Sequence, residues 1–177
     1  HLVAALLDEG CRVKLLVREG SDEGLLKRTL ERTGTAALYD RIEFSRTALN
    51  NPHELDEALQ GIDIVFHCAA RVSFDPGEAD AVVSSNTEMT THVVNSCLAC
   101  GVGLMVHVSS IATLGRPLDA GAPITEACIL NSLVGRTAYG ISKIYAENTV
   151  LRGMRQGLRA VIVNPSIILG ESDWKRG

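Results

Sequence analysis

Short apolar segments alternate with longer segments of mixed polarity along most of the chain. The apolar segments are typical of buried strands, which we expect at residues 12–17, 42–44, 62–67, 104–108 and 160–163. The segments between them have apolar side chains three or four positions apart, and we expect helices at residues 1–10, 22–32, 52–60, 78–100 and 136–155. Strands that alternate with helices form right-handed βαβ units. The pattern therefore predicts an α/β fold, a doubly wound parallel sheet covered by helices on both faces.

The ends of the predicted helices carry local signals, with one exception. Asn51 is a favourable N-cap, Pro52 suits a first turn, and Gly61 is a stop signal for the same helix. Gly10 is a suitable C-cap for the first helix, but that helix has no N-cap residue of its own. In a sheet of order 3-2-1-4-5-6 the first strand is central, and a glycine-rich turn joins it to the first helix. We expect this strand and turn to be missing from these residues, and the chain to be a fragment.

Composition and charge exclude several classes of protein. The 177 residues carry a formal net charge of −4, and 46% of them are hydrophobic. This length fits about one domain, and the apolar fraction is that of a globular protein. No apolar run approaches the roughly 20 residues that cross a bilayer, and no basic block stands out. We therefore expect neither a membrane nor a nucleic acid as a partner.

The cysteines and histidines do not group as metal ligands. Cys97 and Cys100 have the spacing of a redox or zinc pair, but no second pair lies at zinc spacing, so two buried thiols are favoured. No metal site is predicted. The five cysteines are an odd number and no secretory segment is visible, which favours free thiols and a cytoplasmic location.

The segment Tyr139-Gly140-Ile141-Ser142-Lys143 is the strongest chemical signal in the sequence. A spacing of four residues places the Tyr139 and Lys143 side chains on one face of the predicted helix. A free phenol has a pKa of about 10, and a neighbouring ammonium favours the phenolate and lowers that pKa. A tyrosine tuned in this way can exchange a proton with a carbonyl or alcohol oxygen.

Ser109 and Ser110 follow directly after the predicted strand at residues 104–108. The carboxyl ends of strands in doubly wound sheets bind ligands, so Ser110 could hold a substrate oxygen near Tyr139. The alternative is that Ser110 only caps a turn or helix. Its position at a strand end, followed by the Tyr139 and Lys143 helix, favours a catalytic role.

These motifs resemble those of the extended short-chain dehydrogenases/reductases, also called the NAD-dependent epimerase/dehydratase family. The resemblance covers essentially the whole chain and is greatest for the dihydroflavonol-4-reductase-like branch. Five segments carry it: Val65 to Ala70, Asn86 with Thr90, Ser109-Ser110 to Gly115, the Tyr139 and Lys143 pair, and Asn164 to Gly170. Met89 stands where the family has glycine. Ala48 and Asn51 stand where it has acidic residues beside adenine, so adenine binding could be altered.

The resemblance implies a role for each matching residue. Tyr139 would be the acid/base, Lys143 would bind the ribose and lower the pKa of Tyr139, and Ser110 would orient the carbonyl. The cofactor would contact Cys68, Ala69, Ala70, Asn86, Val108, Tyr139, Lys143, Asn164, Pro165 and Ile168. It further implies a Rossmann domain over residues 1–170 without its first strand and glycine-rich turn, and a truncated substrate-binding part that begins at residues 171–177.

The strand predicted at residues 12–17 corresponds to the second strand of the family's fold. The residue that follows it bears on the choice of cofactor. NAD-specific folds usually place a carboxylate there, whereas Arg18 suits the 2′-phosphate of NADP. Arg18 could instead be a solvated surface residue, and Glu19 could serve NAD. We favour NADP and keep NAD as the alternative.

The motifs favour hydride transfer between this cofactor and a small-molecule carbonyl or secondary alcohol. Related dehydratases carry an acidic pair where this chain has Ile111-Ala112, and many epimerases have Val-Tyr-Gly where it has Thr113-Leu114-Gly115. A nucleotide-sugar epimerase is the alternative enzyme, and a non-catalytic NADP sensor or scaffold is the alternative of another class. Related enzymes pair through two long helices, so we expect a homodimer of the full-length protein. We expect the 177 residues alone to fold poorly, to bind NADP weakly and to be inactive.

Overall fold

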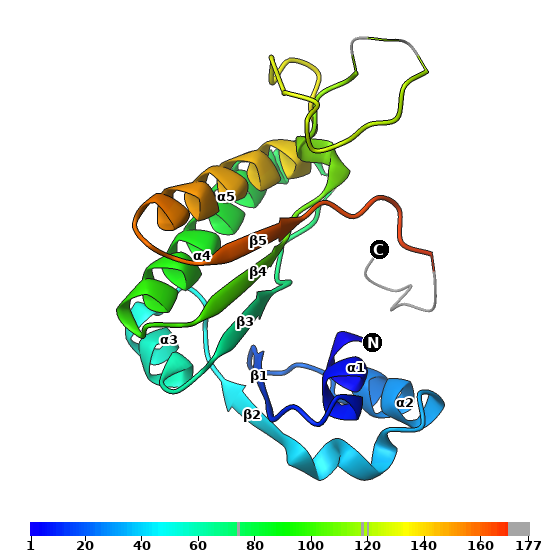
Figure 1. Cartoon of the computed structure of the whole chain (residues 1–177), viewed down its shortest axis with the longest axis vertical. Helices are drawn as coiled ribbons and strands as arrows, with labels where there is room; N and C mark the ends of the chain where they lie inside the picture. Colours follow the sequence, from blue (N-terminus) through cyan, green and yellow to red (C-terminus); the bar gives the residue numbers. More distant parts are fainter. Residues whose placement is uncertain (74, 118, 120, 170–177) are drawn as a thin grey trace. The chain divides into compact units, whose positions relative to one another are not determined.

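A computed structural model describes residues 1–73, 75–117, 119 and 121–169 of the chain (Figure 1). These residues form two compact units, residues 1–48 and residues 49–169, which we call the N-terminal unit and the C-terminal unit. The single domain expected over residues 1–170 stays a prediction, and each unit is described by itself.

The N-terminal unit contains a two-stranded parallel sheet. Its elements are α1 (Leu2–Asp8), β1 (Val13–Val17), α2 (Gly24–Arg32), the 3₁₀ helix η1 (Ala36–Arg41) and β2 (Ile42–Arg46). Val13 of β1 lies opposite Ile42 of β2, and both are buried. Ala4 and Leu7 of α1 and Leu30 of α2 complete this core. Gly10, the expected C-cap, has a φ of 77°, which glycine adopts without steric cost.

The C-terminal unit contains a three-stranded parallel sheet of order β3-β4-β5. Its elements are α3 (Pro52–Leu59), β3 (Ile64–His67), η2 (Pro76–Glu78), α4 (Ala79–Ala99), β4 (Leu104–Val108), η3 (Ile111–Thr113), α5 (Ala138–Arg155) and β5 (Ala160–Val163). The Asn51 side chain accepts a hydrogen bond from the Glu54 amide at 3.5 Å, so the expected cap of α3 is confirmed. Each predicted helix and strand is present, and its ends agree with the structure to within two residues.

Helices α4 and α5 pack closely against each other in the C-terminal unit (Figure 1). Val94 of α4 and Val150 of α5 are fully buried, and Gly153 of α5 allows the close approach to Val94. The buried side chains of β4 alternate along the strand, as they do where one face of a sheet is covered. Some apolar side chains of β3 and β5 are exposed instead, namely Ile64, Val161 and Val163. Among the described residues of this unit, part of the sheet therefore stays exposed, whereas the sequence had predicted helices on both faces.

The strand orders agree with a doubly wound fold. In the order 3-2-1-4-5-6, the second and third strands pair on one side of the first strand, and the fourth, fifth and sixth pair on the other. The β1-β2 pair and the β3-β4-β5 sheet correspond to these two groups, and all of their pairings are parallel. The α/β prediction is thereby confirmed. The three short 3₁₀ helices were not predicted, because none has enough residues to show a periodic pattern.

Candidate active site

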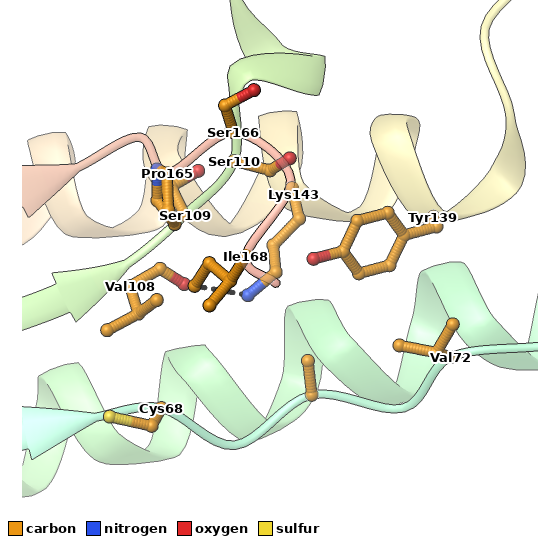
Figure 2. A pocket seen from close by; sticks show the side chains of 11 residues that line it. Cys68, Val72, Val108, Ser109, Ser110, Tyr139, Lys143, Pro165, Ser166 and Ile168 are labelled. Atoms are coloured by element: carbon orange, nitrogen blue, oxygen red, sulfur yellow. Dashed lines mark hydrogen bonds between the residues drawn. The ribbon is translucent and has the colours of Figure 1, made fainter. Parts of the chain in front are cut away.

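A cavity of about 380 Å³ lies at the carboxyl ends of the strands in the C-terminal unit (Figure 2). Doubly wound sheets bind ligands at this end of their strands. The loop after β3, the end of β4, helix α5 and the segment after β5 all contribute to its wall. The lining residues are Cys68, Ala70, Val72, Val108, Ser109, Ser110, Tyr139, Lys143, Pro165, Ser166 and Ile168.

Helix α5 brings Tyr139 and Lys143 to the cavity together, as the spacing predicted. The Thr137 side chain caps this helix by accepting a hydrogen bond from the Gly140 amide at 3.1 Å. The Lys143 Nζ lies 5.9 Å from the centroid of the Tyr139 ring and donates to the Val108 carbonyl at 2.8 Å. Only 4% of Lys143 is exposed, and burial lowers the pKa of its ammonium, although Cys68 and Glu147 act in the opposite direction.

The pKa of Tyr139 corrects one sequence-based expectation. Lys143 was expected to lower it, but in the structure the pKa of Tyr139 is raised from its usual value of 10.0. Burial is the larger cause because it disfavours the charged phenolate, and a hydrogen bond with the Ser110 side chain acts in the opposite direction. The Lys143 ammonium is directed to the Val108 carbonyl, as Figure 2 shows. Burial therefore favours the neutral hydroxyl of Tyr139 over the phenolate.

The structure is compatible with both roles considered for Ser110, the catalytic one and the capping one. Its hydroxyl lines the cavity and interacts with Tyr139, as a substrate-orienting residue would. It is also the N-cap of η3, and its Oγ accepts a hydrogen bond from the Ala112 amide at 3.2 Å. This hydrogen bond holds the Ser110 side chain just after the carboxyl end of β4. The capping role is therefore compatible with a catalytic one.

Three predicted cofactor residues of the C-terminal unit do not line the cavity, and two of them, Asn86 and Asn164, bond to other segments instead. Asn86 accepts from the Arg71 amide at 2.7 Å and donates to the Arg71 carbonyl and to the Ser142 hydroxyl, each at 2.9 Å. Asn164 contacts Ser110, Thr113 and Glu147, as described below. Ala69 does not line the cavity either. Asn86 therefore organises the loop after β3 and is not itself a wall residue.

Arg18 belongs to the N-terminal unit. It follows directly after β1, at the carboxyl end of the strand, and is exposed to solvent. This is the position that the sequence predicted. A role in cofactor binding remains a prediction.

Sequence reasoning missed three wall residues, Val72, Ser109 and Ser166. Ser109 stands next to the predicted Ser110, and its Oγ is buried without a hydrogen-bond partner among the described residues. Val72 and Ser166 lie in loops after β3 and β5, where no periodicity marks a side chain as facing a cavity.

Two buried histidines lie opposite each other in the sheet, next to the cavity residues. The rings of His67 on β3 and His107 on β4 are stacked, with centroids 5.3 Å apart. His67 Nε2 lies 3.1 Å from the Thr90 hydroxyl, whereas neither ring nitrogen of His107 has a partner in the described part of the chain. Burial is the main cause that lowers the pKa of His67 to about 3 and that of His107 to about 4. Both rings are therefore neutral near pH 7.

The described residues lack two further kinds of site. They contain no group of three or more histidine, cysteine, aspartate or glutamate side chains that could hold a metal ion. None of the helices among them has the length and apolar character needed to span a bilayer.

Comparison with known proteins identifies the family. The model of the NAD dependent epimerase/dehydratase family matches residues 1–176, nearly the whole chain. The chain belongs to this family. The resemblance inferred from the Ser110, Tyr139 and Lys143 motifs is thereby confirmed.

Individual relatives of this epimerase/dehydratase chain agree with the assignment. A Synechocystis protein with the provisional name dihydroflavonol 4-reductase is 31% identical over 99% of this chain and 47% of its own length. A Stigmatella aurantiaca protein named 4-hydroxy-2-methyl-3-oxo-4-farnesyl-3,4-dihydroquinoline-1-oxide ketoreductase is 30% identical over 98% of this chain and 48% of its own. The chain thus spans about half the length of these curated relatives.

A solved structure shows the same fold with a nicotinamide cofactor. It is a short-chain dehydrogenase/reductase superfamily protein from Agrobacterium tumefaciens, with bound NAD. It superposes with a TM-score of 0.68 and 26% identity, over 92% of the epimerase/dehydratase chain and 44% of its own chain. The Rossmann fold expected from the sequence is therefore confirmed by structural similarity as well as by the strand order.

Proposed function

We propose that the complete protein is an NADP-dependent oxidoreductase that reduces a carbonyl group of a small molecule to a secondary alcohol. One observation carries the proposal: Tyr139, Lys143 and Ser110 line a single cavity at the carboxyl ends of parallel strands. These three side chains can donate a proton, bind hydroxyl groups and orient a carbonyl oxygen. The ketoreductase and reductase names of the relatives support the same class of reaction.

The cavity has features that fit a nicotinamide nucleotide. Lys143 is a buried cation with three N–H donors, and the described residues use one of them, at the Val108 carbonyl. Cys68, Ala70, Val108, Pro165 and Ile168 supply an apolar wall beside these donors. We assign cofactor contact to these residues and to Tyr139. A bound nicotinamide would supply the hydride of the reduction.

The protonation state of Tyr139 supports the reductive direction. Burial raises the pKa of Tyr139 and so favours the neutral hydroxyl, which is the form that can donate a proton to a carbonyl oxygen. The Ser110 hydroxyl, held by the cap of η3, can donate a hydrogen bond to the same oxygen and so align it with Tyr139.

Two other functions remain as alternatives. The family name covers epimerases, so a nucleotide-sugar epimerase is one of them. The other is a protein that binds NADP without catalysis, as a redox sensor or scaffold. The presence of a complete Ser110, Tyr139 and Lys143 set favours an enzyme over the second alternative.

The replacement Tyr139→Phe in the complete protein tests the proposal. Removal of the proton donor should lower turnover by about 10²- to 10⁴-fold, the range typical of general acid-base catalysis, with little change in the Kd of NADP. Turnover is measured as NADPH oxidation with a panel of ketones, and the Kd by fluorescence titration.

Tyr145→Phe is the matched control, because Tyr145 lies on the same helix and does not line the cavity. It should retain wild-type turnover. Near-normal turnover in Tyr139→Phe would remove Tyr139 from the mechanism, and NADP binding without turnover in the wild-type protein would favour the sensor or scaffold.

A further inference from the structure

Three separate segments of the chain must keep a fixed geometry around the cavity. Helix α5 carries Tyr139 and Lys143, the turn after β4 carries Ser110, and the segment after β5 carries Pro165 and Ile168. The backbone gives one direct link between the last two, since the Ile111 amide donates to the Pro165 carbonyl at 3.1 Å. Lys143 links α5 to the end of β4 through the Val108 carbonyl, but among the described residues it makes no hydrogen bond to the segment after β5.

Glu147 makes the link to the segment after β5. Its Oε1 accepts a hydrogen bond from Asn164 Nδ2 at 2.6 Å and lies 2.8 Å from the Thr113 hydroxyl. Asn164 Nδ2 also contacts the Thr113 hydroxyl at 2.9 Å and the Ser110 carbonyl at 3.3 Å. We call these three side chains the Glu147 cluster: Glu147 from α5, Thr113 from η3, and Asn164, the first residue after β5. The cluster joins the three segments that line the cavity.

The chemistry of the cluster favours a carboxylate at its centre. The Thr113 hydroxyl lies 2.9 Å from the Ser110 carbonyl and has a single proton, so it can donate either to that carbonyl or to Glu147. An ionised carboxylate oxygen accepts several hydrogen bonds at once, and such bonds are stronger than those between neutral groups. Thr113 is buried, with 5% of its surface exposed, so loss of Glu147 leaves its single hydroxyl proton to the Ser110 carbonyl alone.

Glu147 also lies outside the wall of the cavity in which the proposed reaction would occur. It lies one helical turn after Lys143 and does not line the cavity. Glu147 therefore does not transfer a proton to the substrate itself. The segments that it joins carry Ser110 and Pro165, which do line the cavity.

We propose that Glu147 is a positioning residue: through Asn164 and Thr113 it fixes Ser110 and the segment after β5 relative to Tyr139. The inference rests on the function proposed above. Displacement of a reacting group by about 1 Å can lower a rate by about 10²-fold, so loss of the cluster should act on turnover.

The first test compares Glu147→Ala, Glu147→Gln and the control Glu88→Ala in the complete protein. Glu88 is an exposed carboxylate on α4. Glu147→Ala should lower kcat by about 10- to 100-fold at a temperature where the variant stays folded. The amide oxygen of Glu147→Gln can still accept both hydrogen bonds and should restore kcat to within about threefold of wild type. Glu88→Ala should have wild-type kcat. Equal losses in the alanine and glutamine variants would overturn the proposal.

The second test does not depend on activity. Amide hydrogen exchange at Ile111 reports the contact between the turn after β4 and the Pro165 carbonyl. Exchange should be faster in Glu147→Ala than in wild type, and unchanged in Glu88→Ala. If Glu147→Ala has wild-type exchange at Ile111, or faster exchange with wild-type kcat, Glu147 is not a positioning residue. If the wild-type protein has no turnover, the proposed function fails, whereas a faster exchange confined to Glu147→Ala still supports the link.

Discussion

At the scale of single residues, the stacked histidines link the stability of the C-terminal unit to pH. The pKa of His67 is lowered to about 3 and that of His107 to about 4, from the ordinary value of 6.5, chiefly by burial. Below pH 6.5 the unfolded chain binds protons at both positions that the folded chain does not bind. Their contribution to stability is therefore fully present above pH 6.5. It is lost as the pH falls through 6.5 toward the folded pKa values.

The replacement His107→Leu should reduce this pH dependence. Between pH 6.5 and 4.5 the slope of the unfolding free energy should become shallower, by up to about 1.4 kcal/mol per pH unit. The variant should lose little stability at pH 7.5, because it also removes two buried ring nitrogens that have no partner among the described residues. Urea unfolding as a function of pH measures both quantities. His53→Leu, at an exposed position on α3, is the control, and an equal change in its slope would contradict the assignment to His107.

Arg18 carries the prediction about cofactor choice. If it binds the 2′-phosphate, Arg18→Ala should raise the Kd of NADP by about tenfold or more and leave the Kd of NAD nearly unchanged, since only NADP loses a charge-assisted contact. Fluorescence titration of the complete protein measures both constants. Arg12→Ala, just before the other end of β1, controls for a general loss of positive charge. Equal effects of Arg18→Ala on the two cofactors would make Arg18 an ordinary surface residue.

The sequence predicted some site residues and not others, for a physical reason. Tyr139 and Lys143 could be predicted because a spacing of four fixes their common face on a helix, wherever that helix packs. Asn86 and Asn164 have positions consistent with the family motif, but their amides bond to other segments, which depends on the packing of α4 and α5. Glu147 was not singled out, because its partners come from two other elements and no local spacing marks them.

At the scale of the elements, Gly153 sets how closely α5 approaches α4. A methyl group at this position would lie 2.6 Å from Val94 Cγ1 and 3.3 Å from Leu158 Cδ2. Valine in a helix has essentially one rotamer, so Val94 cannot turn away from the clash. The helices would have to separate, and each makes part of the core of the C-terminal unit.

We therefore expect Gly153→Ala to lower the unfolding free energy by about 1–2 kcal/mol, because overpacking outweighs the better helix propensity of alanine. The control is Gly140→Ala on the same helix, where the added methyl group would lie 3.4 Å from its nearest neighbour, Thr137 Oγ1. Its stability should stay within about 1 kcal/mol of wild type. Thermal unfolding of both variants tests the difference, and a stabilised Gly153→Ala would show that the helices have room to spare.

The ends of helices and strands were predictable where the polarity of the sequence changes sharply or where a capping residue is present. Asn51 and Pro52 mark the start of α3, and β4 and β5 were located to the residue from their apolar runs. The exposed faces of β3 and β5 were not foreseen. A continuous apolar run indicates two buried faces, and the sequence does not say which residues would cover the second face.

At the scale of the whole molecule, the homodimer remains a prediction. On α4 and α5, the valines at positions 82, 93, 94 and 150 are buried within the chain itself and are not available to a second copy. Helix α5 instead exposes Tyr145, Leu151 and Met154, each about 40% accessible. Leu151 and Met154 lie three positions apart on one face of α5, and contiguous exposed apolar side chains are typical of an interaction surface.

We expect the complete protein to have the mass of a dimer in light scattering at micromolar concentration, and Leu151→Glu to shift that mass toward the monomer. Leu133→Glu, at an exposed leucine in the loop before α5, should remain dimeric. A monomer mass for the wild-type protein would exclude this assembly at the concentration tested.

Cys68 gives the cavity a chemical handle. Its side chain lies in the wall of the cavity that contains Lys143, and the residue is exposed to solvent. Burial of the sulfur raises the pKa of the thiol, so a maleimide would react slowly at neutral pH and faster in a mildly alkaline buffer. With the other exposed cysteine, Cys11, replaced by serine, a fluorophore attached at Cys68 would sit in the wall of the pocket. The chain thus carries its own attachment point for an optical reporter of ligand entry.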